Sequence, residues 1–178
     1  MTEEAEPQAA GTGKGIGIAY AFLNRRERTV AEVRGRLERA DVGPEEIDAV
    51  IGELVEFGYL DDARYARVFT QDKRTLDAWG GERIARALRE RGVERDLIEA
   101  ALAGDAAPDP WGAADPLADG SCAGSELDRA VALLTRRFPA GALAQRDRER
   151  AFGVLARKGY ESETAADAVR EWARRGAA

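Results

Sequence analysis

Apolar residues recur along this chain at intervals of three and four, the spacing that places them on one face of an α-helix. No segment alternates with the period of two that a half-buried strand requires. The clearest stripes are Val30, Val33 and Leu37; Ile47, Val50, Ile51, Leu54 and Val55; and Leu127, Val131 and Leu134. The aromatic residues that fall at helical spacing and are predicted to lie in the core are Tyr20, Phe22, Phe69, Phe152 and Trp172. The pattern predicts an all-α protein.

Residues typical of helix ends and helix N-termini separate these stripes. Gly58 falls where a helix end favours a residue that tolerates the left-handed conformation. Asp61 follows and can cap the next helix by accepting its free N–H groups. Thr29 and Glu32 have the spacing of a capping box, and Ser162 is the predicted cap of the last helix.

One spacing occurs three times: a leucine is followed ten residues later by an apolar residue. The pairs are Leu37 and Ile47, Leu88 and Ile98, and Leu155 and Ala165, with Gly92 and Gly159 as stops inside the second and third pairs. A repeat of this kind predicts tandem three-helix units that stack on their neighbours. The predicted divisions are a disordered acidic leader at 1–14, units at 15–60, 61–104 and 126–178, and a Pro/Gly-rich acidic linker at 105–125.

The glycine-rich segment 11–15 invites comparison with a phosphate-binding loop. It lacks the first glycine of that motif, carries Gly15 where the hydroxyl residue belongs, and follows no strand. We therefore assign it to the leader.

Composition removes several classes of function. The 178 residues include no histidine and a single cysteine, Cys122, so zinc ribbons and Ser-His or Cys-His catalytic pairs cannot be assembled. Asp61 and Asp62 are adjacent at a helix start and diverge, so they do not form a catalytic dyad. No enzyme activity, cofactor or metal is expected. The acidic start is unlike a signal peptide, no apolar run has the length of a membrane span, and a cytoplasmic protein is expected.

The net charge of −6 is unevenly distributed. Segments 1–13 and 105–125 carry three and four acids and no base, whereas 126–178 carries 11 bases and 8 acids. The acidity therefore belongs to the leader and linker, and the helical body remains able to meet an anionic partner.

Several motifs together resemble the RecX family, regulators of the bacterial recombinase RecA. The matching segments are Leu23-Asn24-Arg25-Arg26 with Thr29 to Leu37, Gly58 to Asp62 with Tyr65-Ala66, Gly80 to Gly92, and Phe152 to Tyr160. The resemblance implies an elongated, curved array of three-helix repeats that lies along the RecA–DNA filament and restrains the recombinase, affecting DNA repair, recombination and the SOS response. The 105–125 insert and the acidic balance depart from the usual pattern of the family.

The candidate partner-binding residues are Arg25, Arg26, Arg28, Tyr59, Asp61, Asp62, Arg64, Arg136, Arg137, Arg146, Arg150, Arg157 and Lys158. Arg146, Arg150 and Arg157 fall within ~40° of one another on a helix. The alternative for the basic residues is a solvated surface with glutamate partners such as Glu149, and Arg83 is expected to be solvated in this way.

Two functional hypotheses remain open for the whole chain. The first is a regulator, expected to be a monomer, that binds the RecA filament, with DNA inside the filament as a further candidate contact. The second is a helical protein that binds DNA directly through its arginine-rich faces. For the motif around Tyr59, the alternative to partner contact is a helix junction.

Overall fold

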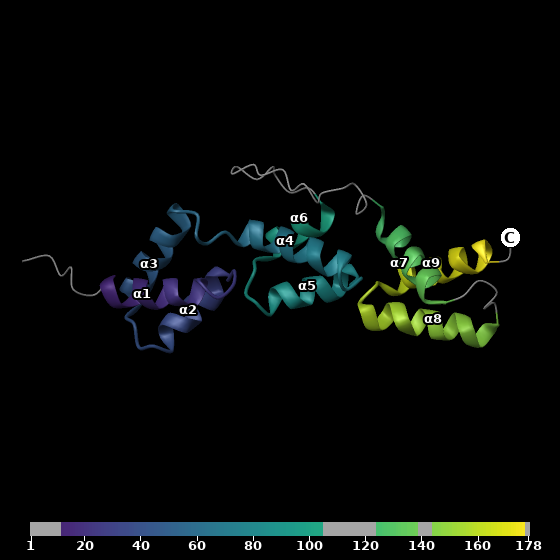
Figure 1. Cartoon of the computed structure of the whole chain (residues 1–178), viewed down its shortest axis with the longest axis horizontal. Helices are drawn as coiled ribbons and strands as arrows, with labels where there is room; N and C mark the ends of the chain where they lie inside the picture. Colours follow the sequence, from purple (N-terminus) through teal and green to yellow (C-terminus); the bar gives the residue numbers. More distant parts are fainter. Residues whose placement is uncertain (1–11, 105–123, 139–143, 177–178) are drawn as a thin grey trace, which may run out of the picture.

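The computed structural model describes residues 12–104, 124–138 and 144–176, and all regular secondary structure in these ranges is helical (Figure 1). The all-α prediction is confirmed. The helices are α1 (Thr12–Leu23), α2 (Val30–Glu38), α3 (Pro44–Glu56), α4 (Asp62–Thr75), α5 (Gly81–Arg89), α6 (Arg95–Ala103), α7 (Glu126–Arg137), α8 (Gln145–Lys158) and α9 (Ser162–Arg175).

The helices form three units that lie in a row along the long axis of the molecule (Figure 1). Unit 1 is α1–α3, unit 2 is α4–α6 and unit 3 is α7–α9, and each unit encloses a hydrophobic core of its own. The six residues of the ten-residue spacing are all buried: Leu37, Ile47, Leu88, Ile98, Leu155 and Ala165. The predicted tandem repeat is confirmed.

Local capping follows the sequence closely at two places. The Thr29 hydroxyl accepts the N–H of Glu32 at 3.1 Å, and the Glu32 carboxylate in turn accepts the N–H of Thr29. Gly58 has a φ of +73°, and the Asp61 carboxylate accepts the N–H of Arg64 at 2.8 Å. Each of these features was predicted, and each is confirmed.

Three details differ from the prediction. Helix α1 begins at Thr12, so residues 12–14 are helical rather than part of a disordered leader. The N-cap of α9 is Glu161, without a side-chain hydrogen bond, and Ser162 is the first helical residue. Phe152 was predicted to lie in the core but keeps 37% of its surface exposed. Residues 1–11 and 105–123, with Cys122, lie outside the described residues.

Units 1 and 2 meet where the N-terminus of α2 touches unit 2. The Thr29 hydroxyl donates to the carbonyl of Arg91 at 2.6 Å, and the Val30 N–H donates to the carboxylate of Asp62 at 2.9 Å. One free N–H at the start of α2, that of Val30, is therefore satisfied by unit 2, and the Thr29 side chain adds a second bond to that unit.

Units 2 and 3 meet in the same way, at the N-terminus of α5. The N–H of Gly80 donates to the carbonyl of Lys158 at 2.9 Å, and the N–H of Gly81 donates to the carboxylate of Glu126 at 2.7 Å. Glu126 is the first residue of the first helix in its unit, as Asp62 is in unit 2. The two junctions thus repeat one hydrogen-bonding plan.

Close backbone contact at these junctions explains two of the glycines. A Cβ on Gly92 would lie 2.3 Å from the Cβ of Ala31, and one on Gly159 would lie 2.3 Å from the Cβ of Arg83. Both glycines have positive φ, +77° and +82°. Asp41 occupies the same position in unit 1 with a φ of 56°, where no unit precedes it among the described residues. A side chain is tolerated there because the helix end is free.

Candidate partner-binding surface

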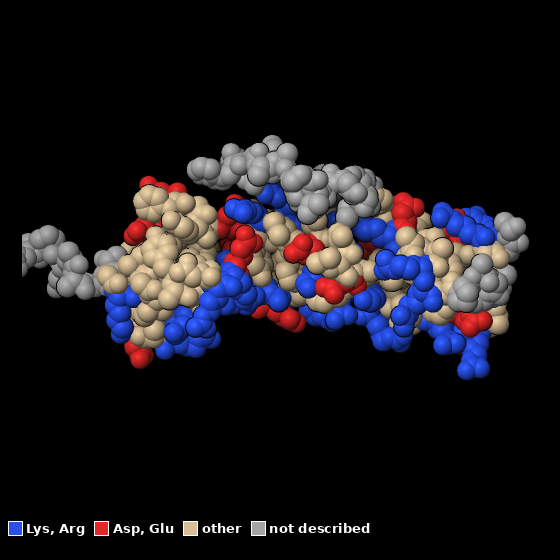
Figure 2. Space-filling model, in the orientation of Figure 1, with Lys and Arg blue, Asp and Glu red and all other residues tan. Residues whose placement is uncertain are grey.

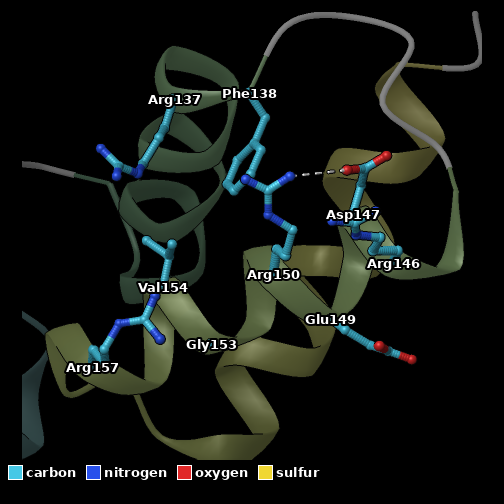
Figure 3. Close-up of a pocket in the computed structure, with 9 residues that line it drawn as sticks. All are labelled: Arg137, Phe138, Arg146, Asp147, Glu149, Arg150, Gly153, Val154 and Arg157. Atoms are coloured by element: carbon cyan, nitrogen blue, oxygen red, sulfur yellow. Dashed lines mark ion pairs between the residues drawn. The ribbon is translucent and has the colours of Figure 1, made fainter.

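A groove runs between α7 and α8 on unit 3, and its lining includes four arginines and two acids, Asp147 and Glu149 (Figure 3). Its volume is about 840 Å³. Arg137 and Phe138 come from the α7 side, and Arg146, Arg150 and Arg157 come from α8. The stripe that the helical spacing predicted therefore forms one wall of a concave surface.

Most of these arginines have no acidic neighbour. Arg150 lies 3.9 Å from Asp147, a long ion pair on its own helix. Glu149 also lines the groove, and its carboxylate accepts a hydrogen bond from Gln145 at 3.1 Å. Four arginines have no carboxylate within 4.0 Å among the described residues: Arg136, Arg137, Arg146 and Arg157. Most arginines of this groove are therefore not ion-paired, while Asp147 and Glu149 lie along it as well.

A second cavity of about 540 Å³ adjoins the first at the junction between units 2 and 3, and it shares Arg137, Val154 and Arg157 with it. Lys158 also lines this cavity, and its ammonium group donates to the backbone carbonyl of Asp77 at 2.6 Å. The hydrogen bond from Lys73 lowers the pKa of the Asp77 carboxyl, so this group stays ionised. We call Arg136, Arg137, Arg146, Arg150, Arg157 and Lys158 the basic groove.

The basic groove belongs to a wider charge pattern. Figure 2 shows Lys and Arg gathered along the lower edge of the molecule, where Figure 1 places α2, α5 and α8. Helix α8 carries five bases and two acids, and α5 carries three bases and one acid. Helix α3 is the opposite, with five acids and no base. Positive charge therefore concentrates on α5 and α8, the second helices of units 2 and 3.

The arginines predicted in unit 1 do not form a comparable cluster. Arg26 is paired with Glu32 at 3.0 Å. Arg28 is half-buried with its guanidinium 3.9 Å from the centre of the Phe22 ring, and burial lowers its pKa. Arg25 alone of the three is exposed without an ion pair among the described residues.

Most residues of the motif around Tyr59 form a helix junction, which was the alternative to partner contact in the sequence analysis. Asp61 caps α4, Asp62 holds the neighbouring unit, and Tyr65 is buried and stacked on Phe69. Arg64 lies 3.6 Å from Glu27 of unit 1.

Tyr59 differs from the rest of this motif because it stays exposed. Its ring meets the ring of Tyr20 edge-on, with the ring centres 5.2 Å apart.

Two residues that line the second cavity were missed by sequence reasoning. Arg83 was expected to be solvated, but its guanidinium lies 4.2 Å from the Trp79 ring centre and donates to the carbonyl of Arg157 at 3.0 Å. Leu76 is 78% exposed beside the second cavity. Both lie at a contact between units that are distant in sequence, and no spacing within one helix reveals such a contact.

The described residues include no group of three or more His, Cys, Asp and Glu side chains placed to hold a metal ion. Within the same ranges, no helix has the length and apolar character needed to cross a membrane.

An elongated row of three-helix units with a groove that carries four arginines defines a helical repeat protein with a charged surface. The sequence model of the first three-helix domain of RecX matches residues 17–54, and that of the second matches residues 61–102. The chain belongs to the RecX family.

Relatives and a solved structure agree with this assignment. The chain is 37% identical to the regulatory protein RecX of Deinococcus radiodurans over 86% of its own length and 67% of that protein. It is 32% identical to the regulatory protein RecX of Mycobacterium avium over 85% and 80% of the two chains. The crystal structure of RecX from Lactobacillus salivarius superposes with a TM-score of 0.71 at 19% identity, covering 92% of this chain and 97% of that one. The last comparison shows the shared fold.

Proposed function

We propose that this chain regulates a RecA-type recombinase by binding the RecA–DNA filament and restraining its activity, without chemistry of its own. Membership of a family of regulatory proteins supports this role. Acting on this partner, the chain would work in the bacterial cytoplasm in DNA repair, recombination and the SOS response.

The observation that carries the proposal is the set of unpaired arginines in the basic groove. Guanidinium groups bind carboxylates and phosphates through paired hydrogen bonds, and those without an internal partner break no ion pair when they do so. Both anions are available on a protein filament wound on DNA. The groove is a large feature of the described surface that folding alone does not explain.

The elongated shape supports a contact with several protomers at once. Three units joined by repeated junctions present their surfaces at fixed spacing, as the row in Figure 1 shows. Linked weak contacts bind far more tightly than each alone, because the first contact raises the effective concentration of the others.

Unit 1, at one end of the row, supports a monomer. Asp41 carries a Cβ where Gly92 and Gly159 carry none, so a preceding unit would collide with it. Terminal units that differ from the inner ones are how repeat proteins stop growing.

Direct DNA binding is the second candidate, and the same arginines favour it. The decisive experiment titrates the full chain into RecA filaments and into naked DNA at several salt concentrations. The proposal expects inhibition of ATP hydrolysis and strand exchange at well below one chain per recombinase, with weak affinity for naked DNA. Tight DNA binding that falls steeply with salt, together with no inhibition of the filament, would favour the DNA-binding alternative.

A further inference from the structure

A second surface lies on unit 1, away from the basic groove on unit 3, and its side chains stay largely exposed. Val55, Phe57 and Tyr59 lie within five residues at the end of α3 and leave 49%, 63% and 57% of their surfaces exposed. We call these three residues, two of which are aromatic, the aromatic edge. Large apolar side chains gathered on a surface commonly mark a protein contact.

Folding accounts for the neighbours of the aromatic edge but not for the edge itself. Leu60 is buried in the core of unit 1, and Gly58 supplies the left-handed turn. Tyr59 makes one edge-on contact, with Tyr20, and that contact leaves its outer face free.

The helix that leads into the aromatic edge is acidic, whereas Arg28 and Arg64 lie near Tyr59 on the side of the junction with unit 2. Helix α3 carries five acids and no base. Asp48 is paired with Arg34 at 2.7 Å and Glu46 accepts the N–H of Gly15 at 2.9 Å. The remaining three acids of the helix have no cation within 4.0 Å among the described residues: Glu45, Glu53 and Glu56.

Glu53 also lies near the tyrosine pair. Burial raises the pKa of the Tyr20 hydroxyl, and Tyr59 and the Glu53 carboxylate raise it further. In Figure 2 the viewed face of unit 1 is mostly tan, with red along its upper margin, where Figure 1 places the end of α3, and blue along its lower edge.

This chemistry selects the class of partner. A nucleic acid or an anionic membrane would be repelled by unpaired carboxylates. A protein surface that carries lysine or arginine around an apolar side chain complements both properties, and aromatic rings additionally attract guanidinium and ammonium groups.

We infer that the aromatic edge and the unpaired acids of α3 form a second contact surface, which binds a basic protein patch with an apolar centre. The inference rests on the proposed function in taking the recombinase filament as the protein that carries this patch. The chain then meets its partner through two surfaces of opposite charge, at opposite ends of the row. Because the two ends cannot exchange places, this arrangement fixes the direction in which the molecule lies on the filament.

The test measures binding of full-length variants to RecA filaments. Phe57→Ser with Tyr59→Ser should weaken binding at least about tenfold while the unfolding midpoint stays near that of the wild type, since both side chains are largely exposed. The matched control is Val68→Ser, an exposed apolar residue on α4, which should leave binding unchanged. Glu53→Gln with Glu56→Gln should weaken binding and reduce its salt dependence.

Other results overturn the inference while keeping the proposed function separate. Wild-type binding by the Phe57/Tyr59 variant, when Arg146→Gln/Arg150→Gln/Arg157→Gln binds poorly, refutes the second surface alone. Unchanged salt dependence in the Glu53/Glu56 variant refutes a basic partner. A wild-type dimer in sedimentation that the Phe57/Tyr59 variant loses would assign the aromatic edge to a second copy of this chain. Binding to the filament by neither the wild type nor any variant refutes both proposals.

A photocrosslinker gives an independent readout. Benzoylphenylalanine in place of Phe57 should crosslink to the recombinase, and the crosslinked peptide should be rich in lysine or arginine. Crosslinks only to DNA or to another copy of the chain would contradict the inference.

Discussion

At the scale of the residue, glycine marks the places where one unit touches the next. Gly92 and Gly159 have positive φ and would collide with the preceding unit if they carried a Cβ, whereas Gly104 has a φ of +78° with nothing within 4 Å. The three positions separate two costs that a substitution can incur: backbone strain and steric overlap.

Gly92→Ala is expected to lose about 2–4 kcal/mol of unfolding free energy, since the strain of the left-handed backbone adds to overpacking against Ala31. Gly104→Ala should lose only the strain, about 1–2 kcal/mol. Urea unfolding of the two variants measures the difference. Equal losses would show that the close contact at the junction does not exist.

Asp62 makes the stability of the junction between units 1 and 2 depend on pH. Burial raises the pKa of its carboxyl, and the charges of Asp61 and Glu94 raise it further, against the opposing hydrogen bond from Val30. Because the folded pKa exceeds the ordinary value of 3.8, folding takes up a proton. The stability from this group is therefore full below 3.8 and declines as the pH rises through the folded pKa.

Asp62→Asn keeps an oxygen acceptor for the N–H of Val30 and cannot ionise. We expect it to be more stable than the wild type at about pH 7, with the advantage vanishing below the ordinary pKa. Asp62→Ala removes the acceptor and should lose about 1 kcal/mol at neutral pH. Denaturant unfolding across this pH range is the measurement, and an advantage of Asp62→Asn that grows in acid would contradict the assignment.

At the scale of the element, the residue that caps a helix N-terminus has one of two roles: it caps its own helix only, or it also bonds to the neighbouring unit. Ser125 caps α7 locally, where it is exposed. Thr29 is fully buried and both caps α2 and donates to the carbonyl of Arg91. The same kind of capping box therefore either closes a helix or joins two units.

Thr29→Val should cost about 2–4 kcal/mol, because the cap is lost and a buried carbonyl is left without its donor. Ser125→Ala should cost about 1 kcal/mol as a cap alone. Thermal unfolding compares them, and equal costs would mean that the bond to Arg91 contributes nothing.

The sequence alone predicted the elements well and their contacts poorly. The ten-residue spacing, the capping box at Thr29 and the stop at Gly58 follow local rules, and all three are found in the structure. The bonds from Thr29 to Arg91 and from Arg83 to Arg157 join residues far apart in sequence, so helical periodicity contains no trace of them.

The candidate site shows the same division. The spacing of Arg146, Arg150 and Arg157 on one helix was enough to predict that they share a face, and they line one groove. That Arg136 and Arg137 of α7 lie near them depends on how two helices pack, and so does the lack of an ion pair at most of these arginines.

At the scale of the whole molecule, charge is distributed unevenly along the row of units. The basic groove lies on unit 3, and the acidic helix α3 lies on unit 1. No metal cluster was found among the described residues, and the account rests on the shape and charge of the outer surface.

The most direct test compares two variants with the same change of net charge on unit 3. Arg146→Gln/Arg150→Gln/Arg157→Gln neutralises the basic groove, and Arg170→Gln/Arg174→Gln/Arg175→Gln neutralises arginines of α9 that are ion-paired on their own helix. Binding to RecA filaments is measured for both, at equal salt and after unfolding curves confirm that each is folded. The account expects the groove variant to bind at least about tenfold more weakly than the wild type, with the α9 variant little changed. Equal binding by both variants would show that net charge, and not this groove, governs the contact.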